Sequence, residues 1–484
     1  MNYKQASSRL RAATAGVIFL CAGCTVGPDY QRPDARVLGA WSEANYPGID
    51  TRSADLARWW EEFNDPVLTR LVNRAAGANL DLRLAESRIR EARALRRIAA
   101  SGAWPTVDVS GSYSRSRTSE NAIGPSSQAN GGSPFFSGSN NGQDLFRTGF
   151  DSSWEIDVFG GVRRSVEAAD ATIDATIEDR RDVLVTLLGD IARNYIDLRG
   201  FQRRLAVAEN NLKAQQESLE IIDVRFQAGL ASDLQVAQAE AQVNTTAAEI
   251  PALEALTKQA AHRVDVLLGL QPGALSGELS ADAPIPALPP EAQVGLPSEL
   301  LRRRPDIRRA ESQLAAATAE IGVATADLYP KFSLSGLFGV QSVSGSDWIS
   351  APSRFWSIGP TVRWPVFDAG RIRANIEVRT ARQEQAVTQY EKTVLAAFED
   401  VENALVSYAK EQTRYRSLMN AVVANRRALA LADELYKNGL VDFLNVLDSQ
   451  RALYLAESDL AQSEATMATN LVALYKALGG GWEN

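Results

Sequence analysis

Residues 225–230 read Arg-Phe-Gln-Ala-Gly-Leu, and 210 positions later residues 435–440 read Leu-Tyr-Lys-Asn-Gly-Leu. Leu268-Gly269 and Leu478-Gly479 keep the same offset. Nearer the N-terminus the offset is 225, because Asp, Arg, Ala, Glu and Ser recur at matched positions within 81–87 and 306–312. A period this long predicts two copies of one large module and not an array of short repeats.

Long helices are predicted on both sides of each glycine turn. The first covers about 162–228 and its counterpart about 371–438, which at ~1.5 Å per residue is on the order of 100 Å. Apolar residues recur in them at every seventh position, a pattern typical of coiled-coil packing. The columns are Leu184, Ile191, Leu198, Leu205, Leu212, Leu219 and Phe226, and Val387, Val394, Val401, Tyr408, Tyr415, Val422, Leu429 and Tyr436.

Each copy also carries two predicted strands, at about 105–118 and 147–158, and at about 330–340 and 355–367. Apolar and polar residues alternate in them, which is the period of a strand with one apolar face. Their lengths suit tilted membrane strands, although alternation alone also fits a soluble β-sandwich. Four strands cannot close a membrane barrel, and lipid does not tolerate an open sheet edge. The chain is therefore expected to assemble as a trimer or larger. Two copies would give eight strands and an interior filled by side chains, whereas three give twelve strands and could leave a lumen.

The N-terminus has the features of an export signal. Lys4, Arg9 and Arg11 precede an apolar stretch at 12–22, which is too short to span a bilayer. The sequence Cys21-Ala22-Gly23-Cys24 resembles a bacterial lipobox, which makes Cys24 the expected site of lipidation. The alternative is an ordinary signal peptide that is cleaved nearby. No other stretch reaches 18 consecutive apolar residues, so no helical membrane span is predicted.

These observations give an expected domain organisation. Repeat 1 begins with one helix at about 66–101, and repeat 2 with one at about 297–327. The two segments rich in proline or tryptophan, before repeat 1 and between the repeats, are expected to wrap the outside of the helical body. The full order is a signal peptide (1–23), a lipid-anchored extended segment (24–65), repeat 1 (66–270), a Pro-rich equatorial linker (271–296), repeat 2 (297–479) and a C-terminal tail (480–484).

Several motifs resemble the outer membrane factors, or TolC-like proteins, and in particular the lipoprotein branch that serves resistance-nodulation-division (RND) efflux pumps. The resemblance covers nearly the whole chain. Its motifs are Cys-Thr-Val-Gly-Pro-Asp-Tyr at 24–30, Trp59-Trp60 with Asp65-Pro66, Leu-Pro-Ser-Glu-Leu-Leu at 296–301, Arg-Pro-Asp-Ile at 304–307, Val-Phe-Gly-Gly at 158–161 and Val-Phe-Asp-Ala-Gly at 366–370.

The resemblance implies an α+β membrane protein whose homotrimer forms one 12-stranded antiparallel β-barrel on a long coiled-coil α-helical barrel. It implies a palmitate-bearing lipoprotein in the outer membrane of a Gram-negative bacterium. It also implies the exit duct of a tripartite system for multidrug or metal efflux, with a periplasmic adaptor and an inner-membrane RND pump as partners. The alternatives are the outer-membrane component of type I protein secretion and, from another class, a structural coiled-coil tether.

The resemblance also assigns functional residues. The segment Leu-Asn-Val-Leu-Asp at 444–448 resembles the family's periplasmic gate, with Asp448 projecting into the lumen and Asn445 one turn earlier. The first copy has Gln238 and Gln235 at these positions, so an acidic ring is expected only from the second. Gly229 and Gly439 flank the grooves where adaptors dock in the family. The plainer alternatives are a solvated helix carboxylate for Asp448 and ordinary helix termination for the two glycines.

Composition argues against other functions. Formal net charge is −8, which does not favour nucleic-acid binding. His262 is the only histidine and no cysteine follows Cys24, so a metal site built on His and Cys is not expected. No nucleophile–base constellation or phosphate-binding loop is apparent, so neither an enzyme nor a cofactor is predicted. Asp442 is expected to cap the second returning helix, and Ser232 with Gln235 to form a capping box for the first.

Overall fold

The computed structural model describes most of the chain in two compact units. The sheet unit comprises the described residues of 25–31, 92–172 and 313–386, and the helical unit comprises those of 32–91, 173–312 and 387–482. The signal peptide and Cys24 lie outside the described residues. The described ranges are 25–34, 37, 39–43, 46–52, 56–117 and 142–482.

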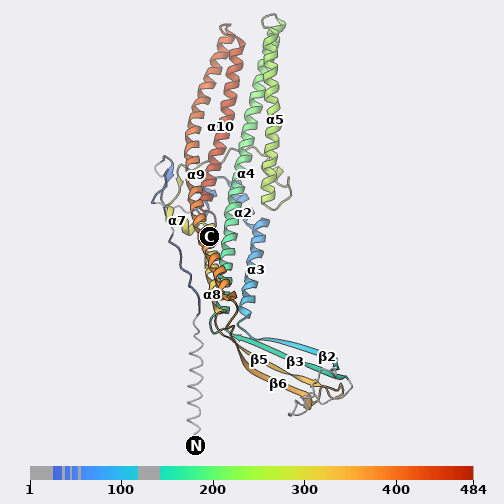
Figure 1. Cartoon of the computed structure of the whole chain (residues 1–484). Coiled ribbons are helices and arrows are strands. Elements are labelled where there is room, and N and C mark those ends of the chain that lie inside the picture. The colour runs from blue at the N-terminus through green and yellow to red at the C-terminus, as the bar shows by residue number, and fades with distance from the viewer. Residues whose placement is uncertain are drawn as a thin grey trace. The chain divides into compact units, whose positions relative to one another are not determined.

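Helices dominate the chain and follow the order predicted from the repeats. In Figure 1, α4 pairs with α5 and α9 pairs with α10, and the turns of both pairs lie at the same end. The helices are α2 (Pro66–Ala78), α3 (Leu80–Ser101), α4 (Gly161–Gln227), α5 (Asp233–Leu267), α6 (Ser276–Leu279), α7 (Pro297–Arg303), α8 (Pro305–Ala326), α9 (Arg371–Lys437) and α10 (Phe443–Ala477), with 3-10 turns at Trp59–Phe63 and Ala351–Ser353.

The two long helices are confirmed, and every member of their heptad columns except Phe226 is buried or partly buried. Helices α4 and α9 each contain 67 residues, and the returning helices α5 and α10 each contain 35. Column members such as Ile191, Leu198, Val401 and Tyr408 are buried in one large core cluster. The apolar seam therefore stabilises these helices by packing, because helix propensity alone contributes little to such long elements.

The prediction of one continuous helix at the start of each repeat is wrong, because the structure has two consecutive helices in each place. Asn79 adopts an extended conformation between α2 and α3. Its side chain accepts hydrogen bonds from Asp81 N (2.8 Å) and Leu82 N (3.0 Å), and it donates to Leu267 O (2.8 Å). In repeat 2 the break falls at Arg304, since a residue that precedes a proline disfavours the helical conformation.

The N-terminal segment is part of the core, which corrects the expectation that it only wraps the outside. Trp59 is 1 % exposed, and its ring centroid lies 5.9 Å from that of Trp60 and 5.5 Å from that of Tyr475. Trp41 packs on Phe398 and donates to Gly295 O at 3.0 Å. A short parallel pair of β1 (Ile49–Asp50) with β4 (Ala292–Gln293) joins this segment to the inter-repeat linker. The segment thus ties both repeats together.

The last described residues also pack into the helical unit. A Cβ atom on Gly481 would lie 2.7 Å from Leu188 Cδ1, and one on Gly480 would lie 2.9 Å from Leu56 Cβ. The Trp482 indole donates to Arg303 O at 2.9 Å. Its ring lies beneath two guanidinium groups, with centroid distances of 4.5 Å for Arg181 and 5.1 Å for Arg308. The C-terminal segment therefore closes the core, although the sequence alone indicated only a tail.

The sheet unit contains four antiparallel strands in the order β2-β3-β5-β6, as Figure 1 shows. Trp356, Ile358, Val107 and Val109 are highly exposed on one face, with Trp356 at 74 %. Because cross-strand partners share a face, the pairs Val109–Phe150 and Phe338–Trp356 place these apolar side chains together. The strands are β2 (Thr106–Ser116), β3 (Gln143–Ile156), β5 (Lys331–Ser342) and β6 (Arg354–Arg363).

Residues 25–29 form a strap that is clamped by Arg164, whose side chain is only 4 % exposed. The guanidinium donates to Val26 O (3.1 Å), Gly27 O (3.4 Å) and Asp29 Oδ1 (2.7 Å). The strap lies against α8, since a Cβ atom on Gly27 would come within 2.4 Å of Gly322 Cα. Gly27 also has a φ of +91°, which favours glycine over any other residue.

The clamp gives a first prediction. Arg164→Met should release the strap, because each hydrogen bond to a charged group contributes about 1.5–3 kcal/mol to stability. Hydrogen–deuterium exchange should show the Val26 amide, which donates to Phe159 O at 3.2 Å, exchanging at least about tenfold faster. The matched control is Arg96→Met, which removes an exposed arginine paired with Asp170 in the same unit. Equal protection in both variants would contradict the clamp.

Candidate functional site

The two turns that join the paired helices have the same geometry. Gly229 and Gly439 adopt φ values of +72° and +70°, and nothing lies within 4 Å of a Cβ atom built on either. Both glycines are therefore required by the left-handed backbone and not by close packing. In each turn the residue after the glycine donates to a carbonyl five residues earlier, at 2.8 Å for Leu230 and 2.9 Å for Leu440. Both leucines are 70 % exposed.

The starts of the returning helices differ from one another. The predicted capping box of α5 is present, with Ser232 and Gln235 each bonding the other's backbone. The prediction that Asp442 caps α10 is only half right. Asp442 occupies the N-cap position, but its side chain makes no capping hydrogen bond. Its carboxylate instead accepts a hydrogen bond from Gln235 Nε2 at 2.8 Å, which links the two helical pairs at their turns.

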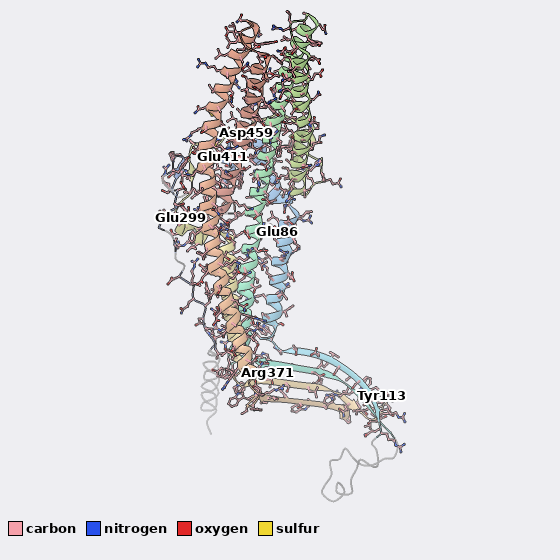
Figure 2. The ribbon with its side chains drawn as sticks, turned by 45° about the horizontal axis from the view of Figure 1, so that its top comes forward. Glu86, Tyr113, Glu299, Arg371, Glu411 and Asp459 are labelled. Carbon is pink, nitrogen blue, oxygen red and sulfur yellow. The ribbon has the colours of Figure 1, made fainter. Side chains whose placement is uncertain are left out.

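The first turns of α10 have one packed face and one open face. Phe443, Val446 and Leu447 are buried in a cluster with residues of α4, α5 and α9. Asn445 and Asp448 are exposed and lie three residues apart, so they share the open face. Asp459 lies farther along α10 from this turn, as Figure 2 shows.

The contacts of the two candidate gate residues are weak. Asn445 Nδ2 donates to Asp442 O at 3.2 Å. Asp448 Oδ1 lies 3.8 Å from Arg451 Nη1, and the two side chains are 62 % and 57 % exposed. An exposed pair of this kind contributes little to stability. Asp448 is thus held only weakly by its neighbours in the described chain.

A polar seam that the sequence did not predict joins α5 to α10. Gln235, Gln242 and Glu249 are spaced by seven residues and occupy one column of α5. Gln242 Oε1 accepts two hydrogen bonds from Arg451, both at 3.1 Å, and Glu249 accepts one from the Tyr454 hydroxyl. The seven-residue spacing of these polar residues is the sequence feature from which the seam could have been predicted.

The seam is partly buried. Burial raises the pKa of Tyr454, and its hydrogen bond to Glu249 raises it further, so the hydroxyl stays protonated and donates. A further hydrogen bond, from Gln450 Nε2 to Ser218 Oγ at 2.9 Å, joins α10 to α4. Polar groups buried along a coiled coil fix its register at some cost in stability. The seam therefore sets how α10 lies against the first pair, and any outward movement of α10 must break it.

The described part of the chain gives no support to a metal site or to a helical membrane span. No group of three or more His, Cys, Asp or Glu residues there could hold a metal ion. His262 is exposed on α5. Within the same residues, no helix combines the length and hydrophobicity that crossing a bilayer requires.

Paired long helices, a four-stranded sheet with an exposed apolar face and a twofold internal repeat define the class of outer-membrane channels. The family model described as "Outer membrane efflux protein" matches residues 71–270 and 296–480. The chain belongs to this family and is an outer-membrane exit duct for tripartite efflux, not an enzyme. The predicted fold class is thereby confirmed.

Particular relatives span almost the whole chain. It is 34 % identical over 479 residues to Nodulation protein T of Rhizobium leguminosarum bv. trifolii, covering 98 % of this chain and 97 % of that protein. It is 33 % identical over 475 residues to the solvent efflux pump outer membrane protein SrpC of Pseudomonas putida, covering 96 % and 97 %.

Solved structures agree with these relatives. The outer-membrane channel OprN aligns with a TM-score of 0.86 at 38 % identity, covering 95 % of this chain and 100 % of that chain. The open-state outer membrane channel MtrE of Neisseria gonorrhoeae aligns with a TM-score of 0.81 at 30 % identity, covering 95 % and 99 %. Outer membrane efflux channels form trimers and work with periplasmic adaptors and inner-membrane pumps.

Proposed function

We propose that three copies of this chain form one gated duct that passively carries solutes from a periplasmic adaptor and an inner-membrane RND pump to the exterior. The observation that carries the proposal is the sheet of four strands, which has β2 and β6 at its edges. Open edges are not tolerated in lipid. Three sheets joined edge to edge supply twelve strands, and a barrel of that size leaves a lumen.

The gate of the duct is Asp448, with Asn445 one turn nearer the helical turn. Both lie on the open face of α10, so a threefold arrangement of α10 helices brings three carboxylates around one axis. Such a ring attracts cations, and its three like charges repel one another. The acidic ring comes from the second copy alone, since its counterpart in the first copy, Gln238, is neutral.

The two turns are the docking sites for the adaptor. Gly229 and Gly439 allow the left-handed turns that present Leu230 and Leu440, and exposed leucines at paired sites suit an apolar partner surface. A photo-crosslinker placed at position 440 should capture the adaptor in cells. The same crosslinker at Ser344, beyond β5, should not, and capture at both positions would contradict docking at the turns.

The anchor of the duct is a lipid on Cys24, the residue immediately before the clamped strap. Such a lipid places the chain in the outer membrane of a Gram-negative bacterium, with a large periplasmic part. Incorporation of labelled palmitate should be lost in Cys24→Ser. Equal labelling of that variant would overturn the assignment.

The class of solute that the duct carries is set by the pump, because a duct wide enough for many solutes selects little among them. Relatives of the chain include outer membrane proteins of solvent, toluene and antibiotic efflux pumps and of pyoverdine export. We therefore assign drugs, toxic organic compounds or metal ions to this chain. Type I protein secretion is the second candidate, and the family match to efflux proteins favours the first.

The test of the duct is electrical. Full-length protein extracted in detergent and added to planar bilayers should produce discrete conductance steps, and chemical cross-linking should give trimers as the largest product. A matched preparation that lacks β5 and β6 should give no steps. If the chain without its signal peptide is a soluble monomer, the result contradicts the duct and favours a coiled-coil tether.

A further inference from the structure

A pocket in the helical unit lies away from the gate and from the docking turns. It has a volume of about 490 Å³ and is bounded by α4, α5 and residues 273–282 of the inter-repeat linker. This volume falls within the ~300–1,000 Å³ that is typical of small-molecule sites. Its apolar lining is formed mainly by Leu198, Leu205, Ala206, Ala261 and Leu279.

The walls of the pocket are held in place by buried polar contacts. Asp265 is 1 % exposed, and its carboxylate accepts hydrogen bonds from Gly273 N (2.6 Å) and Leu275 N (3.0 Å). Gln202 Nε2 donates to Leu279 O at 2.9 Å, and Arg199 Nη1 donates to Ala281 O at 2.6 Å. The linker is therefore fixed against both helices before any ligand arrives, which lowers the entropy cost of binding.

The rim of the pocket is acidic. Glu209, Glu254 and Asp282 are exposed at its edge, and within the described chain none of them has a hydrogen bond or ion pair. Lys258 is the one lysine or arginine of the lining, against three carboxylates at the rim, so the rim carries an excess of negative formal charge. An apolar floor beneath an acidic rim is complementary to a ligand with a hydrophobic body and a positive charge.

We propose that this pocket binds amphipathic organic cations. The apolar body of the ligand lies on the leucine floor, and its positive charge faces Glu209, Glu254 and Asp282. The bound ligand contacts α4, α5 and the linker together, so it stabilises the helical unit. The site is independent of the gate, because its residues lie about four or more turns of α5 from the first turn of that helix.

The probe is tetraphenylphosphonium, and tetraphenylborate is its control of similar shape and opposite charge. Calorimetry on the detergent-solubilised trimer should show binding of the cation at low ionic strength. The cation should also raise the temperature at which the trimer dissociates. The anion should bind at least about tenfold more weakly, since an acidic rim repels it. Equal binding of both ions would refute charge recognition, and no binding of either would refute the site.

Variants separate this pocket from nonspecific adsorption. Glu254→Gln should weaken cation binding on the order of threefold, and Glu254→Gln with Asp282→Asn about tenfold, as expected for partly exposed charge pairs. Ala206→Phe fills the cavity without a change of charge and should abolish binding. The matched control is Glu240→Gln, an exposed carboxylate on α5 that lies 14 residues earlier in the same heptad column. An effect of the control as large as that of Glu254→Gln would overturn the proposal.

Discussion

Trp59→Ala is expected to destabilise the helical unit by about 3–5 kcal/mol, the range for removal of a buried aromatic side chain. Trp59 is almost fully buried, and its ring packs against Trp60, Phe63 and Tyr475. Tyr475 belongs to α10, so the cavity left by the substitution lies between the N-terminal segment and the second repeat. Few rearrangements can fill a cavity bounded by such distant segments.

The measurement is the temperature at which the trimer dissociates, read from heated samples on gels. Trp59→Ala should lower it by several degrees or prevent assembly, and Trp59→Phe should recover part of the loss. Trp104→Ala is the matched control, because Trp104 is 73 % exposed and its removal creates no cavity. If both alanine variants dissociate at the same temperature, the N-terminal segment is not part of the core.

Asp448→Asn is expected to change the electrical behaviour of the duct without a loss of stability. Its only ion pair in the described chain, with Arg451, is long and exposed. Three carboxylates around one axis favour cations, so their removal should reduce the potassium-to-chloride permeability ratio by about twofold or more. Reversal potentials measured in a salt gradient report this ratio directly.

A second variant should move the ratio the other way. Asn445→Asp adds three carboxylates one turn nearer the helical turn, and it should raise the preference for cations. The control is Asp433→Asn, which neutralises an exposed carboxylate of α9 that is paired with Lys437 at 2.6 Å. Reversal potentials and low-voltage conductance that are the same in Asp448→Asn and in the wild type would remove Asp448 from the gate.

Features with a local period could be predicted from the sequence. Val401 and Tyr408 belong to an apolar column of period seven, and both are buried in the core. Trp356 and Ile358 alternate with polar residues, and both lie on the exposed face of the sheet. Period alone is sufficient in these cases because the same spacing recurs over many residues.

Features that depend on distant partners could not be predicted in this way. Asn79 breaks the first helix by bonding to Leu267 O, 188 residues later in the chain. Trp59 is buried against Tyr475, and nothing in the local sequence indicates that pairing. The break at Arg304 is different, because Pro305 was a readable signal. The choice of Asp448 came from the resemblance of residues 444–448 to a family segment, but the bond from Arg451 to Gln242 depends on the register between two helices.

The packing of residues 479–482 has a consequence for biogenesis. Trp482 and the glycines before it complete a core that also contains Trp59 and Leu188. Because synthesis proceeds from the N-terminus, this core cannot close until residues 479–482 have been made. Until then the chain exposes apolar surface that chaperones can bind. Early release or truncation would leave a chain that is easily recognised as unfinished.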